Sequence, residues 1–383
     1  MAERIERTEQ IEKVLPGAEV RRLAERWLPH LGRGGTDFAC SPTGLWLALA
    51  SVAAGARGGT AAELRALLGV AGEEAAGAVT EGARALAGTD ALAVATGVWS
   101  RLPVYRAYRE ALPDIGFGPM DPGGIDAWVD RATGGLVPRL PVRITEATQL
   151  VLVNALALKA RWAVPFKGSA TRPKPFTDVS GAEHEVATMH GPVPSGHAWD
   201  VTSTGADARV VELACAAPAA ESSGASPSAS AKVRFVLGAP GAEPAQVLPL
   251  AWAPAEQRRR IDASTIQVAL PKLSLRTTVE ALRHLEALGV RQAFRDSADF
   301  SGLSPEDIAV SQVVQETVVK IAEQGVEAAA ATVVAMRLGS AYRPPTDIEH
   351  IAYDRPFGIV VLDGSGTVPL FTAWQAQAPA ADG

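Results

Sequence analysis

The sequence predicts a protein of mixed α-helix and β-sheet in which a large sheet is covered on both faces. Long apolar segments have the length and composition of buried strands, and segments with helical spacing of apolar residues lie between them. The 383 residues are enough for a large core, and 47% of them are hydrophobic. Gly and Pro are too few and too aperiodic for a collagen-like or wholly disordered chain. A folded body is therefore expected.

The first part of the chain predicts three helices. Apolar side chains recur at helical spacing over residues 17–31 and predict an amphipathic helix. A Ser-Pro pair at 41–42 predicts the start of a second helix, because the hydroxyl can accept an unpaired backbone N–H and proline has none to lose. The residues that follow are apolar on every face, so this helix should be buried. Thr60 and Glu63 have the spacing of a capping box for a third helix that ends at Gly69.

Strands and further helices follow along the chain. Strands are predicted at residues 91–99, 148–158, 209–214, 232–238, 265–270, 357–363 and 368–374, the last two joined as a hairpin through residues 363–366. Amphipathic helices are predicted at 125–133 and 278–289. Residues 216–231 are a low-complexity Ala/Ser/Pro loop. Length alone would allow two or three domains, but the sequence has no internal repeat and no clear linker.

Charge and cysteine content narrow the functional classes. The chain has 36 basic and 42 acidic residues and a net charge of −6, which argues against a protein that tracks nucleic-acid phosphates. Its basic run, Arg258–Arg260, is interpreted as a solvated loop. Cys40 and Cys215 cannot form a disulfide framework, and they are either two buried thiols or one bridge.

The chain shows no targeting or membrane segment. No stretch reaches the ~20 uninterrupted apolar residues of a membrane span. The N-terminus lacks the apolar run of a signal peptide. We therefore expect a non-exported, cytoplasmic protein without nucleic-acid or membrane partners, unless a leader has been removed.

Common enzyme signatures are also absent. The sequence has no nucleophile elbow, phosphate-binding loop, complete dinucleotide fingerprint or H-E-x-x-H motif. His184, His190 and His197 come nearest to a metal pattern, but neither interval suits one helix face, so neither a metal nor a cofactor is predicted. A hydrolase with a dispersed Ser-His-Asp triad stays open, although nothing selects its residues.

Residues 322–343 are the most informative segment. Helix-forming Ala and Glu alternate there with β-branched residues and with Gly325, so propensity leaves helix and strand about equally favoured. As a strand, the segment would turn small or apolar groups and one hydroxyl to one face: Val326, Ala328, Ala330, Thr332, Val334 and Met336. Both of its charged residues between 326 and 337 would lie on the opposite face, as burial requires. Such a segment could be an exposed loop and also a central strand, although an ordinary strand fits the pattern too.

Several motifs along the chain, taken in their order, resemble motifs of the serpin family. The resemblance covers nearly the whole length of the sequence. Glu323, Gly325 and residues 328–332 resemble the family's proximal hinge. Residues 125–140 resemble the helix that lies across the main sheet, and 152–166, with Trp162, resemble a sheet strand followed by the breach region. Further matches lie at Thr171, Phe176, Met189, 270–275, 287–294, 298–303, 354–357 and Phe371.

The resemblance implies an α+β fold with three β-sheets, about eight or nine helices and an exposed reactive-centre loop at about 323–347. It implies a single domain over residues 1–383, a monomer, and a protein that is not an enzyme. The implied function is inhibition of a chymotrypsin-, subtilisin- or trypsin-like serine protease by a suicide mechanism: the loop is cleaved, the acyl-enzyme is trapped and the loop inserts into the main sheet. The alternative is a non-inhibitory serpin-like scaffold or protease substrate.

The resemblance also assigns residues. The family's count from Glu323 places the reactive bond between Gly339 and Ser340, with Arg337 and Leu338 as alternatives because the loop is somewhat long. The implied hinge comprises Glu323, Gly325, Val326, Ala328, Ala330 and Thr332. Trp162 would form the breach, and the implied sheet-opening region comprises Ser41, Asn154 and Gln315.

Two positions in the sheet-opening region depart from the family. Gln315 stands where many relatives have His, and Gly44 replaces a frequent Ser close to Ser41. We therefore expect the hydrogen-bond network that controls opening of the sheet to be wired differently, through Gln315 and Asn154.

Overall fold

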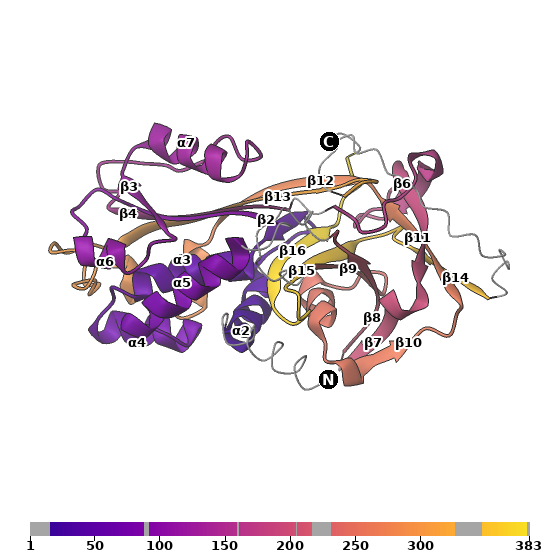
Figure 1. Ribbon diagram of the computed structural model, residues 1–383, viewed down its shortest axis with the longest axis horizontal. Coiled ribbons are helices and arrows are strands. Elements are labelled where there is room, and N and C mark those ends of the chain that lie inside the picture. The colour runs from indigo at the N-terminus through magenta and orange to yellow at the C-terminus, as the bar shows by residue number, and fades with distance from the viewer. Residues whose placement is uncertain are drawn as a thin grey trace, which may run out of the picture.

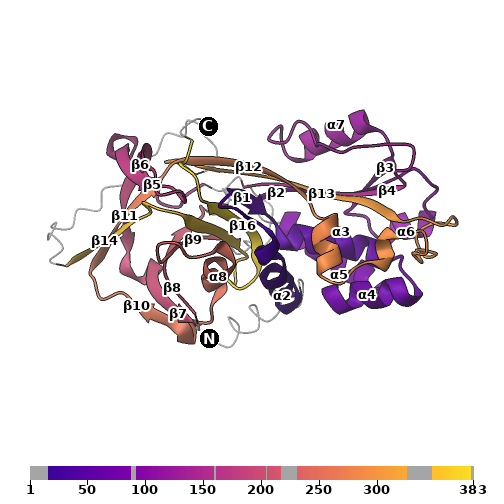
Figure 2. The same cartoon turned by 180° about the vertical axis from the view of Figure 1, so that it is seen from behind.

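The computed structural model describes residues 16–87, 92–158, 161–203, 205–216, 231–325 and 347–380. These residues form three β-sheets and a group of helices in an elongated body (Figure 1). One sheet runs along the long axis, with most helices gathered at one end. The other two sheets lie at the opposite end, as the reverse view also shows (Figure 2).

The sheet along the long axis has five strands. In spatial order they are β12 (Leu273–Glu280), β13 (Val310–Ile321), β4 (Leu150–Leu158), β2 (Leu92–Ser100) and β3 (Gly116–Pro119). Helix α7 (Pro122–Ala132) covers one face and α3 (Pro42–Ala53) lies under the other (Figure 1). Every residue of β4 is buried as a result. The predicted sheet covered on both faces is confirmed.

The two faces of β4 pack into different apolar clusters because side chains alternate along a strand. Leu150 and Leu152 belong to the main core, whereas Val151 and Val153 belong to a smaller cluster. That smaller cluster includes Val129 of α7. The five-stranded sheet therefore lies between two apolar clusters, one on each face.

The remaining strands form two further sheets. A seven-stranded sheet has the order β1 (Phe38–Cys40), β16 (Pro369–Gln375), β15 (Phe357–Leu362), β9 (Lys232–Gly238), β8 (Ala206–Ala214), β7 (Ala198–Ser203) and β10 (Arg258–Arg260). A four-stranded sheet has the order β14 (Ile348–Ala352), β11 (Thr265–Pro271), β6 (Glu183–Pro194) and β5 (Arg172–Thr177). The predicted strands and the hairpin formed by β15 and β16 are confirmed.

The other described α-helices are mostly short. They are α2 (Gly17–Trp27), α4 (Gly58–Leu68), α5 (Glu73–Ala87), α6 (Arg106–Glu110), α8 (Pro244–Val247) and α9 (Leu282–Ala287). The predicted start of α3 is confirmed, because the Ser41 hydroxyl accepts the backbone N–H of Gly44 at 2.8 Å. The end of α4 is confirmed as well: Gly69 has φ +82°, a left-handed conformation that suits glycine.

The capping box predicted at Thr60 is wrong. Helix α4 already begins at Gly58, and neither side chain caps it. The Thr60 hydroxyl accepts the N–H of Asp299 instead, and the Glu63 carboxylate accepts the N–H groups of Arg291 and Gln292. Both side chains therefore hold a segment that is distant in sequence.

Two further predictions are corrected by strand pairing. Residues 278–280 continue strand β12 instead of starting a helix, because they pair with β13. Helix α9 begins only at Leu282. Arg258–Arg260 is an edge strand paired with β7, not a solvated loop. Arg258 donates two hydrogen bonds to Ala253 O and lies over the Trp199 ring.

Cys40 and Cys215 are two free, buried thiols and do not form a bridge. Burial raises the pKa of each thiol to about 12. Both therefore stay protonated at neutral pH and behave as small apolar groups. In the low-complexity loop, residues 217–230 lie outside the described part of the chain. No helix within the described ranges is long and apolar enough to cross a membrane.

A histidine contact joins the first helix to α9. Trp27 Nε1 donates to His284 Nδ1 at 3.1 Å, and the His30 ring stacks on His284 at 6.0 Å. Burial and the neighbouring His30 and Arg33 charges lower the pKa of His284. Below the ordinary histidine pKa, the unfolded chain therefore binds more protons than the folded chain, and protonation also removes the acceptor for Trp27.

We expect the free energy of unfolding to fall as the pH is lowered below about 6.5, toward the lowered pKa of His284 in the folded chain. Part of this fall should disappear in His284→Gln, which keeps an oxygen acceptor for Trp27 but does not titrate. Urea unfolding at a series of pH values measures both. The matched change His350→Gln, at an exposed position on β14, should keep the wild-type pH dependence. An unchanged dependence in His284→Gln would contradict the role given to this contact.

Candidate functional site

The centre of the five-stranded sheet is a parallel pair of strands, β4 and β13. Gln315 lies opposite Asn154, and Val318 lies opposite Ala157. Because the strands are parallel, the chain leaves both of them at the same edge of the sheet. Residues 161–166, which follow β4, and residues 322–325, which follow β13, meet at that edge.

A tight turn ends β13. Ala322 N donates to Gly325 O at 2.9 Å, and Gly325 N donates to Ala322 O at 3.1 Å. Gly325 has φ +123°, a backbone conformation that side chains disfavour. The same glycine forms an isolated antiparallel bridge with Arg161. Gly325 is thus paired on one side with the chain that follows β13 and on the other with the chain that follows β4.

Glu323 anchors this turn. Thr171 Oγ1 donates to Glu323 Oε1 at 2.8 Å, and Lys272 Nζ lies 3.1 Å from Oε2. The backbone N–H of Phe166 donates to Glu323 O at 2.9 Å. Burial alone would raise the pKa of Glu323, but the hydrogen bond from Thr171 and the contact with Lys272 hold it below its ordinary value. The carboxylate is therefore ionised at neutral pH, and it holds the turn against Thr171 and Lys272.

Trp162 holds the turn from a third direction. Its indole N–H donates to Ala322 O at 2.9 Å, and its backbone N–H donates to Gln324 O at 3.1 Å. The side chain is buried and meets Phe235 edge to face at 6.3 Å. The structure thus brings together Glu323, Gly325 and Trp162. Sequence reasoning missed Lys272, although it lies inside the motif at 270–275 and its charge complements Glu323.

A second polar cluster lies deeper, under the centre of the sheet. Gln315 Nε2 donates to Asn154 Oδ1 and to Ser41 O, both at 2.9 Å, and Gln315 Oε1 accepts the N–H of Ser41 at 2.7 Å. Asn154 Nδ2 donates to Thr96 Oγ1 at 2.9 Å, and the Ser41 hydroxyl donates to Leu370 O at 2.5 Å. All of these residues are buried. The cluster joins β13, β4, β2, β16 and the start of α3.

Gly44 makes room for this cluster. A Cβ atom at position 44 would lie 2.0 Å from Asn154 Oδ1, the atom that accepts from Gln315. Any side chain at position 44 would therefore push the Asn154 amide out of its place. The two departures noted in the sequence belong together: Gln315 uses the Asn154 amide, and Gly44 leaves space for that amide.

The other candidate positions do not join this site. The Nε2 atom of His184 lies 2.7 Å from Asp178 Oδ2, and His190 Nδ1 lies 3.1 Å from Thr188 O. The hydrogen bonds from Ser180 and His184 hold the pKa of Asp178 far below its usual range. Within the described ranges, no group of three or more His, Cys, Asp or Glu side chains is placed to hold a metal ion. The predicted hinge residues Val326, Ala328, Ala330 and Thr332 and the predicted reactive-bond residues Arg337, Leu338, Gly339 and Ser340 lie outside the described part of the chain.

We expect Gly44→Ser to lower the free energy of unfolding by about 2 kcal/mol, because the new side chain overpacks the buried Asn154 amide. Urea unfolding measures the change. Gly77→Ser in α5 is the matched control, since a Cβ there meets no atom within 4 Å, and serine favours a helix slightly over glycine. In an Asn154→Ala background, Gly44→Ser should cost less, with the remaining cost due to Leu156 Cδ1, 2.8 Å from the new Cβ. An equal cost in both backgrounds would show that Asn154 is not what excludes a side chain at position 44.

Comparison with known proteins identifies one family over most of the chain. The family model described as "Serpin (serine protease inhibitor)" matches residues 27–374. Serpin-Z1A of Triticum aestivum is 27% identical over 379 residues, 91% of this chain and 92% of that protein. Plasminogen activator inhibitor 1 of Sus scrofa is 29% identical over 280 residues, and this match spans 69% of the chain but only 64% of the inhibitor's length.

A solved structure agrees with the family match. The crystal structure of Serpin48, described as a highly specific serpin of the insect Tenebrio molitor, superposes with a TM-score of 0.76 at 25% identity. It covers 94% of this chain and 97% of that one. The three sheets found above are thus those of the serpin fold. The family model matches most of the chain, and the chain therefore belongs to the serpin family of serine protease inhibitors.

Proposed function

We propose that this protein inhibits a serine protease by a suicide mechanism in which the cleaved loop inserts between β4 and β13. The observation that carries this proposal is the pairing of Gly325, which is antiparallel both to Ala322 and to Arg161. A strand that continued from Gly325 between β4 and β13 would be antiparallel to both of these parallel neighbours. The pairing of Gly325 supports it as the first residue of such a strand.

The proposed chemistry belongs to the protease. Its serine oxygen attacks the carbonyl carbon of the reactive bond and forms an ester with the residue before that bond, while the amine of the residue after it leaves. For the proposed bond, Gly339 becomes the acyl group and Ser340 becomes a new N-terminus. Insertion of residues 326 onward then carries the tethered protease toward the far end of the sheet and distorts its active site before water hydrolyses the ester.

The drive for insertion comes from sheet hydrogen bonds. The single ladder between β4 and β13 would be replaced by two antiparallel ladders, one on each side of the new strand. The net gain is about one ladder, on the order of ten hydrogen bonds at about 1 kcal/mol each, plus the burial of side chains. Small inward groups at Val326, Ala328, Ala330 and Thr332 suit that burial, because a charge there would cost several kcal/mol.

Insertion of the loop requires β4 and β13 to separate, and this separation must break a side-chain hydrogen bond between them. The Gln315–Asn154 hydrogen bond crosses from β13 to β4 and would be lost as these strands part. Gln315 would keep both of its bonds to the Ser41 backbone, which does not lie on either strand. We propose that this network sets part of the barrier to insertion.

The direct test is incubation with trypsin-, chymotrypsin- and subtilisin-type proteases. We expect an SDS-stable covalent adduct with at least one of them, and a released C-terminal peptide that begins at Ser340. A peptide that begins at Leu338 or Gly339 would move the reactive bond to one of the alternative residues. Cleavage by every protease without an adduct would contradict inhibition and favour the non-inhibitory scaffold or substrate.

A substitution pair tests insertion itself. We expect Ala328→Arg to abolish the adduct and turn the protein into a substrate, because an inward arginine would be buried without a partner. Ala329→Arg is the matched control and should still trap the protease, since its side chain would point outward. SDS gel electrophoresis and the stoichiometry of inhibition measure both. Equal trapping by the two variants would contradict the proposed parity.

A further inference from the structure

A pocket of about 800 Å³ lies beside the turn that ends β13. It is formed where three parts of the chain meet: residues 162–170, the end of β6 with the facing part of β11, and the end of β8. Its volume falls in the range of sites that take small organic molecules. The contacts that Glu323 and Trp162 make with the turn do not fill this space.

The walls of the pocket are mainly apolar. Four buried side chains line it: Trp162, Phe166, Val193 and Leu213. Three prolines line it as well: Pro165, Pro192 and Pro194. Val164 also lines the pocket, and 77% of that residue is exposed, which is unusual for a large aliphatic side chain. A ligand with an aromatic or aliphatic body would remove this surface from water.

The charges around the pocket favour an anion. Lys167 lines it and makes no ion pair with any residue that the structure describes. His190 and His197 line it too, and the pKa of His190 is lowered by burial and by the positive charges of Arg172 and Lys174. His190 is therefore neutral at neutral pH, and Lys167 is the cationic side chain of the lining.

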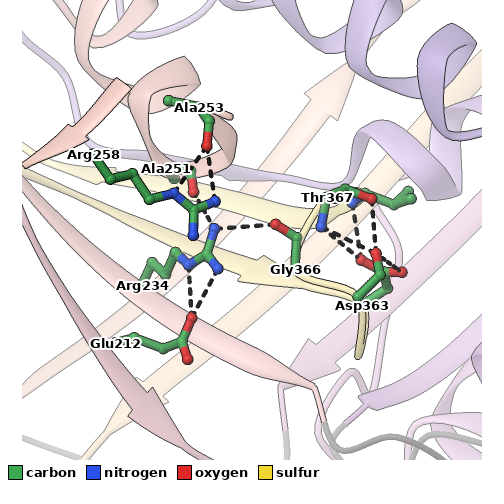
Figure 3. A network of polar contacts seen from close by, with 10 residues as sticks. Glu212, Arg234, Ala251, Ala253, Arg258, Asp363, Gly366 and Thr367 are labelled. Atoms are coloured by element: carbon green, nitrogen blue, oxygen red, sulfur yellow. Dashed lines mark hydrogen bonds and ion pairs between the residues drawn. The ribbon is translucent and has the colours of Figure 1, made fainter. Parts of the chain in front are cut away.

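The acidic side chain in the lining, Glu212, is already neutralised. Figure 3 shows Glu212 bound to the buried Arg234, whose Nη2 lies 2.8 Å from the carboxylate. Arg234 also donates to Ala251 O and to Gly366 O, so it is fixed in place. Glu212 thus adds little repulsion against a bound anion, while Lys167 remains available to attract one.

We propose that this pocket binds an amphipathic organic anion, with an aromatic or aliphatic body against Trp162 and Phe166 and an acidic group near Lys167. Trp162 and Phe166 also hold the hinge, through their backbone bonds to Gln324 O and Glu323 O. A ligand that fits the present arrangement of these residues stabilises it. Occupancy therefore slows opening of the turn, and this second part rests on the proposed function.

The binding test uses 8-anilinonaphthalene-1-sulfonate, an aromatic anion whose fluorescence rises in apolar sites, and its neutral relative N-phenyl-1-naphthylamine. We expect saturable binding of one sulfonate per intact protein, and displacement by decanoate. Ala170→Trp, which fills the pocket from a half-buried turn position, should raise the Kd of the sulfonate about tenfold or more. Lys167→Glu should weaken the sulfonate by a similar factor and leave the neutral probe almost unchanged.

Matched controls lie at the far end of the molecule, on the exposed surface of α6. Ala107→Trp and Arg109→Glu should leave both Kd values unchanged. Thermal melting and circular dichroism identify any variant that has failed to fold, and Lys167→Glu changes an exposed side chain that the fold does not need. Non-saturable binding, or equal Kd values for wild type, Ala170→Trp and Lys167→Glu, would overturn the proposed site.

The effect of a bound ligand on opening of the turn is measured separately, by the rate of covalent trapping. Saturating decanoate should lower the rate of covalent trapping by wild type severalfold and leave trapping by Ala170→Trp unaffected. An unchanged rate for wild type with the pocket occupied would overturn the regulation but not the site. If wild type forms no adduct with any protease, the proposed function and the regulation fail together, and the fluorescence titration still decides the site.

Discussion

The parallel contact between β4 and β13 is the constraint on which the rest of the structure depends. These strands are far apart in sequence, and backbone hydrogen bonds and side-chain packing hold them side by side. Each strand is buried on both faces, so a separated pair would leave unpaired backbone groups that cost free energy. The pair can part only if another strand supplies the same bonds. Gly325 lies at the edge of the sheet where the chain leaves both strands, and contacts of Glu323 and Trp162 hold the turn that contains it.

Buried amides cross the same contact from beneath. A buried polar group is costly unless its hydrogen-bonding capacity is used, and both amides here have partners. Gln315 spans the distance from Ser41 to Asn154 because its side chain presents a donor and an acceptor at once. The arrangement works only without a side chain at position 44. A substitution at Gly44, Asn154 or Gln315 changes which side chains fit at the other two positions. The three positions are therefore energetically coupled.

Much of the fold could be predicted from the sequence, because strand segments buried on both faces have a continuous apolar pattern and Ser41 caps its helix locally. The failures have one cause. Thr60, Glu63 and residues 278–280 carry the local signals of a helix cap or a helix, but their side chains and backbone pair with distant segments, which local patterns do not reveal. Glu323 and Gly325 were assigned from a motif of residues near one another in sequence. Lys272 was not, because its contact with Glu323 spans about fifty residues, and no sequence pattern records how close two segments lie in space.

The Arg234 network ties several strands of the seven-stranded sheet together. Arg234 on β9 binds Glu212 on β8 and the backbone of the β15–β16 connection, so three parts of the seven-stranded sheet share one buried cation. Separating β8 from β9 would leave that buried cation without its counter-ion Glu212, at a cost of about 3–5 kcal/mol. This network therefore makes the seven-stranded sheet a stiff frame. The Trp162 ring meets Phe235 of this frame edge to face, so the chain that follows β4 is packed directly against it.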